Sequence, residues 1–193
     1  MSRAALGFKP RTGRAVLVAL AGDFQQPQVI ERAEIPLLPA GEFAPYHVAA
    51  DLDPEAAASH VQGSVARAQR LATNAVRDYA KRCVEAGYEL GGCGVLVGTG
   101  MPAWSVHEIL AVHARMHQAE GEMFRAVLVQ AVQSCGYELT TLPDKTALDS
   151  AAQKLRITRA RLDTCLARLG RAAGPPWAQY QKEAAVAALV ALQ

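Results

Sequence analysis

Short apolar runs separated by turns open this chain, and they predict β-strands. Apolar residues cluster at positions 4–8 and 15–20, and the segment between them, residues 9–14, contains proline and glycine. A turn of this kind between two β-prone runs is typical of a hairpin. Residues 28–37 mix apolar and charged side chains and predict a third strand at a sheet edge, because Pro36 has no N–H to donate to a neighbouring strand.

The next segment has helical periodicity and ends at a fourth strand. After an expected loop at 39–53, Asp53 and Pro54 have the residue types of an N-cap and a first-turn proline. Apolar residues then recur every three or four positions as far as Gly87, which predicts one long amphipathic helix that packs on the sheet. Residues 88–97 contain a continuous apolar run and predict a buried strand.

A second helix and a fifth strand are predicted in the same way. Ser105 and Glu108 are spaced as a capping box, so we expect a helix from Ser105 toward residue 135. Residues 137–143 predict the fifth strand, and Asp144 is expected to cap the segment that follows it.

The rest of the chain is predicted to be helical. Residues 158–170 form an amphipathic segment, and a turn at 174–177 precedes a final alanine-rich helix that ends at Leu192. The whole order predicts an α/β fold with a mixed five-stranded sheet, in the order βββαβαβα, with helices packed on the sheet and a helical C-terminal tail.

Connection lengths predict the strand directions. The first three strands are joined by short connections and are expected to be antiparallel, whereas the last two each follow a long helix and are expected to be parallel. We therefore place the opening hairpin in the middle of the sheet, against the strand that begins near Tyr88. Residues 1–193 are expected to form a single domain, because 193 residues with 51% apolar side chains suffice for one core.

Composition excludes some classes of protein. The longest apolar run, residues 184–192, is far shorter than the roughly 20 residues that span a bilayer, so we expect no membrane association. The segment Met1-Ser2-Arg3 does not open a secretory signal, and a cytoplasmic location is expected. Cysteines 83, 93, 135 and 165 form no C-x-x-C pair, which favours reduced, partly buried thiols.

Charge is unevenly distributed although the net charge is only +2. Residues 1–22 contain four basic and no acidic side chains, and residues 145–193 contain eight basic and three acidic ones. Within the second segment a basic patch, defined as Lys154, Arg156, Arg159 and Arg161, has the density needed for phosphate contacts. The alternative is a solvated cationic helix face.

Two histidines and a glutamate on the second long helix form the sharpest local cluster. His113, His117 and Glu120 are spaced by four and three residues, so their side chains lie on one helical face and have a geometry that divalent metals use. A water, or a side chain from elsewhere such as His47 or Glu122, would complete the shell of such a metal. The alternative is a hydrogen-bonded polar patch without an ion.

A second candidate site lies at two glycine-containing turns. Lys9, Arg11 and Thr12 precede Gly13, while Gly98 and Thr99 follow the fourth strand. Ligands of open α/β sheets gather at the carboxyl ends of strands, and basic side chains with exposed amides can hold a phosphate. Tight turns without a ligand are the alternative.

Glu183 is a third candidate, in the first turns of the last helix. The helix dipole favours negative charge there, so helix stabilisation explains this glutamate without a catalytic role.

The element order, the hairpin sequence from Leu6 to Gly13 and the alanine-rich helix after Trp177 resemble ribonuclease H-like proteins of the Holliday-junction-resolvase type. They also resemble a group of uncharacterised bacterial proteins with that fold. The resemblance implies handling of nucleic acid, and a family centre in which several carboxylates clamp two metal ions. Here Lys9 or its neighbours stand at the first-strand position, residues 98–100 read Gly-Thr-Gly, and only Glu183 remains in the last helix. The family's hydrolytic mechanism is therefore not expected.

Three interpretations of function follow. The leading one is a ribonuclease H-like domain that binds nucleic acid or another phosphate-bearing ligand without the two-metal centre. The second is a hydrolase that uses a single divalent metal held by the two histidines and Glu120, with Glu122 or His47 transferring the proton. The third is a structural protein whose long helices pair into a homodimer. The sequence does not decide between an enzyme and a binding protein.

Overall fold

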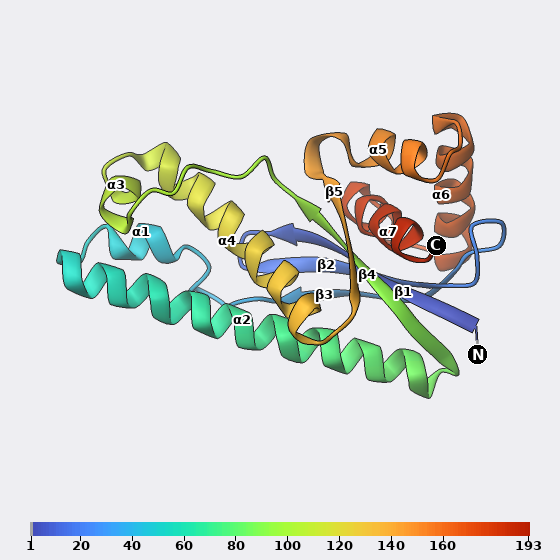
Figure 1. The fold of residues 1–193 in the computed structure, drawn as a ribbon, viewed down its shortest axis with the longest axis horizontal. Coiled ribbons are helices and arrows are strands. Elements are labelled where there is room, and N and C mark those ends of the chain that lie inside the picture. Colours follow the sequence, from blue (N-terminus) through green and yellow to red (C-terminus); the bar gives the residue numbers. More distant parts are fainter. Residues whose placement is uncertain (1) are drawn as a thin grey trace.

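A five-stranded mixed sheet forms the centre of the protein (Figure 1). The computed structural model describes residues 2–193. The strands are β1 (Ser2–Arg11), β2 (Arg14–Ala21), β3 (Gln28–Pro36), β4 (Tyr88–Val97) and β5 (Glu138–Pro143). They lie in the order β3-β2-β1-β4-β5, with β1, β2 and β3 antiparallel and β4 and β5 parallel to β1. The predicted strand directions and the central place of the hairpin are confirmed.

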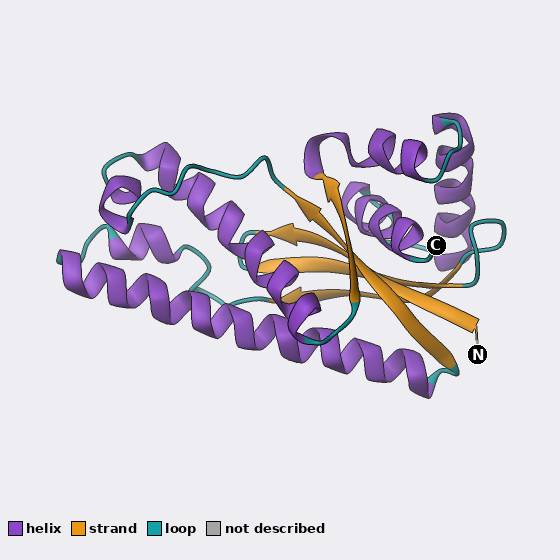
Figure 2. Ribbon diagram, viewed as in Figure 1, coloured by secondary structure: helices purple, strands orange, loops and turns teal. Residues whose placement is uncertain are grey.

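Helices cover both faces of this sheet, as Figure 2 shows. One face carries α2 and α4, and the other carries α5, α6 and α7. The helices are α1 (Pro45–Ala49), α2 (Pro54–Glu85), α3 (Val106–Leu110), α4 (His113–Ser134), α5 (Ala147–Lys154), α6 (Arg159–Ala173) and α7 (Gln179–Ala191), with a 3-10 helix, η1, at Asp144–Thr146. Within residues 2–193, no helix is long and apolar enough to cross a bilayer.

Local capping signals fix the starts of three helices as predicted. The Asp53 carboxylate accepts hydrogen bonds from the backbone N–H groups of Glu55 and Ala56 and so starts α2. Ser105 and Glu108 form the reciprocal capping box at the start of α3. The Thr158 hydroxyl caps α6 in the same way. Each cap satisfies N–H groups that have no partner inside the helix.

Three predictions about boundaries were wrong. The expected loop at 39–53 contains α1, and the helix expected from Ser105 is two helices, because Val112 is extended and starts α4 as its N-cap. The turn predicted at 9–14 is only two residues long. Lys9 and Arg11 therefore belong to β1, and their side chains are held by a strand rather than by a loop.

Two strand glycines let α7 lie directly on the sheet. Residues 184–190 of α7 are all buried. A Cβ added to Gly94 would lie 2.1 Å from the carbonyl oxygen of Ala187, and one added to Gly7 would lie 1.9 Å from that of Ala184. Glycine in a strand interior often marks such a close backbone approach. The backbone of α7 is thus placed over β1 and β4, and its position determines where Glu183 stands.

The four cysteines are free thiols, and the side chain of Cys93 is fully buried. Burial raises the pKa of Cys93 to about 12, so at about pH 8 only roughly one molecule in 10⁴ carries the reactive thiolate there. Burial also raises the pKa of Cys83 and of Cys165. We predict that a chromogenic disulfide reagent labels these three thiols only after denaturation, whereas the half-buried Cys135 reacts first. Rapid labelling of Cys93 in the native protein would contradict this burial.

Candidate functional site at the carboxyl ends of the parallel strands

A polar cleft lies where β1 and β5 end, between α4 and α7. Its volume is about 240 Å³. Its lining comes from the end of β1, from α4, from the start of η1 and from the first turn of α7, and comprises Lys9, Pro10, Arg11, Thr12, Gly121, Arg125, Asp144 and Tyr180. Residues far apart in sequence meet here because parallel strands end at one edge of the sheet.

Lys9 is the centre of this cleft and is buried. Its Nζ pairs with Asp144 Oδ1 and lies 2.9 Å from Glu183 Oε2. The side chains of all three are at most one-fifth exposed, at 9%, 20% and 12%. In such a weakly hydrated place an unpaired charge is costly, so the ammonium and the two carboxylates stabilise one another.

Arg125 extends the network on the α4 side. Its Nη2 lies 3.2 Å from Asp144 Oδ2, and its Nη1 lies 3.3 Å from Glu122 Oε1. Gly98 makes room for this pair at the end of β4, because a Cβ there would lie 2.1 Å from Glu122 Oε1. The carboxylates of Glu122, Asp144 and Glu183 are thus all paired with Lys9 or Arg125, and one further cation lines the cleft.

That further cation is Arg11, which no carboxylate pairs within residues 2–193. Its guanidinium lies 3.8 Å from the centre of the Tyr180 ring, a close cation–π contact. Its Nη1 is shielded from solvent and has no hydrogen-bond acceptor. Buried donors are nearly always bonded in folded proteins, so Arg11 Nη1 is a donor that no protein group uses within residues 2–193.

Three histidines form a separate cluster beside the start of α4, one helical turn before Gly121 of the cleft. His113 and His117 project from the start of α4, and His47 comes from α1. Their ring centres are 4.5–5.1 Å apart, and one ligand nitrogen from each lies within 4.8 Å of the others. The structure therefore brings together the two predicted helix histidines and the predicted third partner.

Glu120 supports this cluster from beneath. It is only 3% exposed, and its Oε1 lies 2.8 Å from His47 Nδ1. The same oxygen accepts hydrogen bonds from the backbone N–H groups of Tyr46 and His47, and so caps α1, which has no side-chain cap of its own. Burial, with a smaller contribution from Glu120, raises the pKa of Tyr46 above its ordinary value. Glu120 thus holds α1 and orients the ring of His47.

Some predicted site residues stand elsewhere. Glu122 pairs with Arg125 and does not join the histidines, although the sequence placed it beside them. Gly98 packs against that pair and leaves no open phosphate position at its own Cα. Thr99 and Thr12 are exposed, and Thr12 lines the cleft.

The predicted basic patch lies away from the cleft. Arg159 pairs with Asp149 as well as Asp163, and Arg161 donates to the Gln25 side chain, in the connection between β2 and β3. The β1–β2 register puts this connection near the start of β1, at the other end of the strand from Lys9. Lys154 and Arg156 are exposed on α5 and just after it. Two of the four basic groups are thus engaged in holding the fold together.

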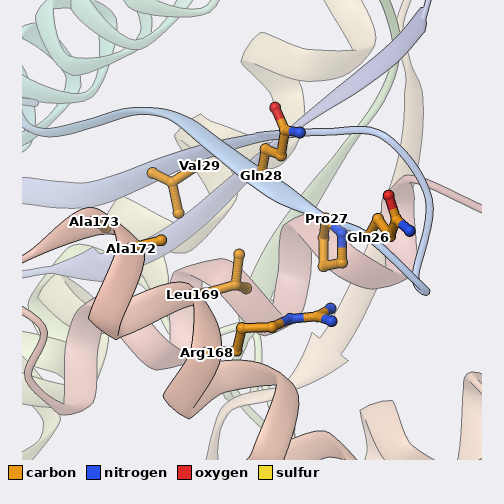
Figure 3. Close-up of a pocket in the computed structure, with 8 residues that line it drawn as sticks. All are labelled: Gln26, Pro27, Gln28, Val29, Arg168, Leu169, Ala172 and Ala173. Carbon is orange, nitrogen blue, oxygen red and sulfur yellow. The ribbon is translucent and has the colours of Figure 1, made fainter.

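A larger cavity, of about 450 Å³, lies in the same region (Figure 3). It runs between α6 and residues 26–29, and Leu169, Ala172 and Ala173 line much of it. Arg168 is the one charged residue in its wall, and its Nη2 donates to the carbonyl of Gln25.

Three cleft residues were missed by sequence reasoning. Asp144 was assigned as a cap, but its carboxylate pairs with Lys9 and Arg125. Arg125 lies eight residues after His117, a spacing that returns to the same face of a helix, so this signal was present in the sequence. Tyr180 carried no such signal, because its contact with Arg11 depends on the docking of α7.

The two-metal centre implied by the resemblance does not fit these residues. A pair of divalent ions requires several carboxylates around open space. Here the Lys9 ammonium fills the space between Asp144 and Glu183, and β4 ends in glycine and threonine. The cation that neutralises Asp144 and Glu183 is thus the Lys9 ammonium of the protein itself.

Comparison with known proteins supports a fold relationship only. No family model matches the chain, and no curated protein matches it in sequence. Among solved structures, Thermus thermophilus RuvC in complex with a Holliday junction substrate matches with a TM-score of 0.53 and 9% identity, over 97% of this chain and 91% of that one. Thermus thermophilus RuvC in another structure matches with a TM-score of 0.50 and 10% identity, over 97% and 92%. With the observed sheet order and helix layers, these matches show that the chain has the ribonuclease H-like fold of the RuvC resolvases.

Proposed function

We propose that this protein binds nucleic acid, or another phosphate-bearing ligand, in the cleft beside Arg11, and does not cleave it by a two-metal mechanism. The observation that carries the proposal is the Arg11 guanidinium, which is fixed against Tyr180 and has a shielded nitrogen without an acceptor. A guanidinium presents paired N–H donors that match a phosphate group, and here it is already oriented before the ligand arrives.

Charge balance supports the choice of Arg11 over its neighbours. Lys9 and Arg125 each contact two carboxylates, so a phosphate that approached them would also meet Asp144, Glu122 or Glu183. Arg11 lies in the same cleft without such a partner, and Thr12 offers an exposed hydroxyl next to it. The proposed phosphate contact therefore involves Arg11 and Thr12, whereas the sequence analysis also included Lys9. In this proposal Lys9 is a structural group.

The matched fold supports DNA as the first ligand to test. One RuvC structure contains a Holliday junction substrate. Because fold alone does not establish function, the cleft chemistry carries the proposal and the matched structure only suggests the probe.

We predict that Arg11→Gln weakens DNA binding by about tenfold or more, because a charged hydrogen bond is worth roughly 1.5–3 kcal/mol. Fluorescence anisotropy with single-stranded, duplex and four-way-junction DNA would measure this. The affinity for DNA should fall as the salt concentration rises. The variant should show a shallower salt dependence, because binding with one phosphate contact fewer releases fewer counterions from the DNA.

Arg70→Gln is the matched control, since Arg70 is an exposed arginine on α2. It should bind like the unmodified protein. Equal losses in both variants would indicate a general charge effect and contradict a site at Arg11. Binding that does not weaken with salt would argue against phosphate contacts altogether.

A second candidate function, a single-metal hydrolase, is favoured by the convergence of His47, His113 and His117. The groups proposed for proton transfer from the sequence support it less well. Glu122 is paired with Arg125, and His47 faces the other two histidines. The histidine cluster nevertheless has a geometry of its own, which leads to the following inference.

A further inference from the structure

The histidine cluster has the spacing of a metal coordination shell. Zinc bound to imidazole at about 2.0–2.1 Å in a tetrahedral shell places its ligand nitrogens roughly 3.3–3.4 Å apart. His47 Nε2 lies 3.3 Å from His113 Nε2. The ligand nitrogen of His117 lies within 4.8 Å of both, so a small rotation of an exposed ring completes the triangle.

Glu120 determines which nitrogen of His47 faces the cluster. His47 Nδ1 lies 2.8 Å from Glu120 Oε1, and His47 Nε2 is directed at His113. A carboxylate accepts and does not donate, so this contact selects the tautomer with the proton on Nδ1 and a free lone pair on Nε2. This carboxylate–histidine arrangement is the usual outer support of a metal-bound imidazole, because it fixes the ring and raises its basicity. A divalent ion would also offset the charge of the buried Glu120 carboxylate, which has no Lys or Arg partner within the described chain, residues 2–193.

Packing alone does not explain the convergence of these rings. His113 and His117 are exposed, so bringing them together removes little apolar surface from water. His47 lies 66 positions before His113 in the sequence. It reaches the cluster because it belongs to the five-residue helix α1, which Glu120 caps. The nitrogens face one another, as ligands of a common ion do.

We propose that His47, His113 and His117 bind one divalent transition-metal ion of the zinc class, and that Glu120 positions His47. Imidazole suits zinc and neighbouring transition metals, whereas magnesium and calcium prefer oxygen. Three protein ligands at an exposed position leave the fourth open to water or to a ligand atom. Gly121 lines the cleft and follows His117 by one turn, roughly 6 Å of helix rise. The ion would therefore stand beside the cleft, but its binding does not depend on the proposed nucleic-acid function.

The test uses protein without a histidine tag, freed of metal by chelation and titrated with Zn²⁺ by calorimetry. We expect one equivalent to bind. His113→Ala and His117→Ala should each lower the affinity by about 100-fold or more, and Glu120→Gln, which keeps an oxygen acceptor, should lower it by about 10–100-fold. His107→Ala on α3 and His60→Ala on α2 are matched controls outside the cluster and should leave the affinity unchanged.

Cobalt provides a readout that does not depend on the variants. Co²⁺ bound to the unmodified protein should show the intense visible absorption of a four-coordinate ion, and Zn²⁺ should displace it. Weak absorption typical of six-coordinate cobalt would overturn the proposal. Binding of less than one equivalent of Zn²⁺, or equal affinity in His113→Ala and His107→Ala, would overturn it as well. Far-ultraviolet circular dichroism of each metal-free variant confirms that lost binding is not lost folding.

Discussion

Gly94→Ala is expected to lower the free energy of unfolding by about 3 kcal/mol, because it forces a methyl group into the backbone of α7. The added Cβ would lie 2.1 Å from the carbonyl oxygen of Ala187 and 2.5 Å from its carbonyl carbon. These are backbone atoms of a helix whose residues 184–190 are all buried, so they cannot rotate away. The helix must therefore lift from β1 and β4 to make room for the methyl group. Urea unfolding followed by circular dichroism measures the change.

Gly63→Ala on α2 gives the opposite expectation and serves as the control. Nothing lies within 4 Å of a Cβ at Gly63, and alanine is favoured over glycine inside a helix by about 1 kcal/mol. The same chemical change should thus stabilise the protein there. If Gly94→Ala were as stable as the unmodified protein, α7 could not be packed against β4 as closely as described.

The fold was predictable where local signals determine it. The apolar run at 88–97 matches β4 at both ends, and Asp53 caps α2 as its residue type indicated. Strand directions followed from connection lengths alone. Each of these features depends on residues close in sequence, and this is why the strand positions and directions could be predicted from one chain.

Features that depend on distant contacts were not predictable. The first turn of α1 is capped by Glu120, from an element 74 residues away, so the segment 39–53 looked like a loop. Val112 interrupts the expected long helix although the apolar pattern continues through it. Strand glycines at 7 and 94 did carry a signal for close approach, but not for which element approaches.

In the candidate sites, too, local features were predictable and distant contacts were not. His113, His117 and Glu120 were found together because helical spacing places them on one face. The contact of the buried Glu120 carboxylate with His47 depends on the docking of α1 and was not predictable from that spacing. Lys9 was noticed as the residue in place of an acidic one. Its partners Asp144 and Glu183 lie 135 and 174 positions away, and only the sheet order brings them to it.

Lys9→Met should destabilise the protein by about 3–5 kcal/mol, the usual cost of removing one member of a buried charge pair. Methionine keeps an unbranched apolar stem like that of lysine and lacks only the terminal ammonium position, so the loss of stability reports mainly on the ammonium. Without it, the Asp144 and Glu183 carboxylates remain in a poorly hydrated cleft, and Arg125 contacts only the first of them. Thermal and urea unfolding, with Lys154→Met as the exposed control, would measure the difference.

A neutral triple variant tests whether charge is the cause. If Lys9 acts by neutralising the cleft, then Lys9→Met combined with Asp144→Asn and Glu183→Gln should recover much of the lost stability, because no uncompensated carboxylate remains beside position 9. If Lys9 acts mainly by filling space, the triple variant should gain nothing over Lys9→Met, which fills nearly the same volume. Recovery would show that Lys9 of this protein serves at the carboxyl end of β1 to balance two acidic side chains. Such an arrangement suits the binding of a phosphate at Arg11 and does not suit the binding of two metal ions.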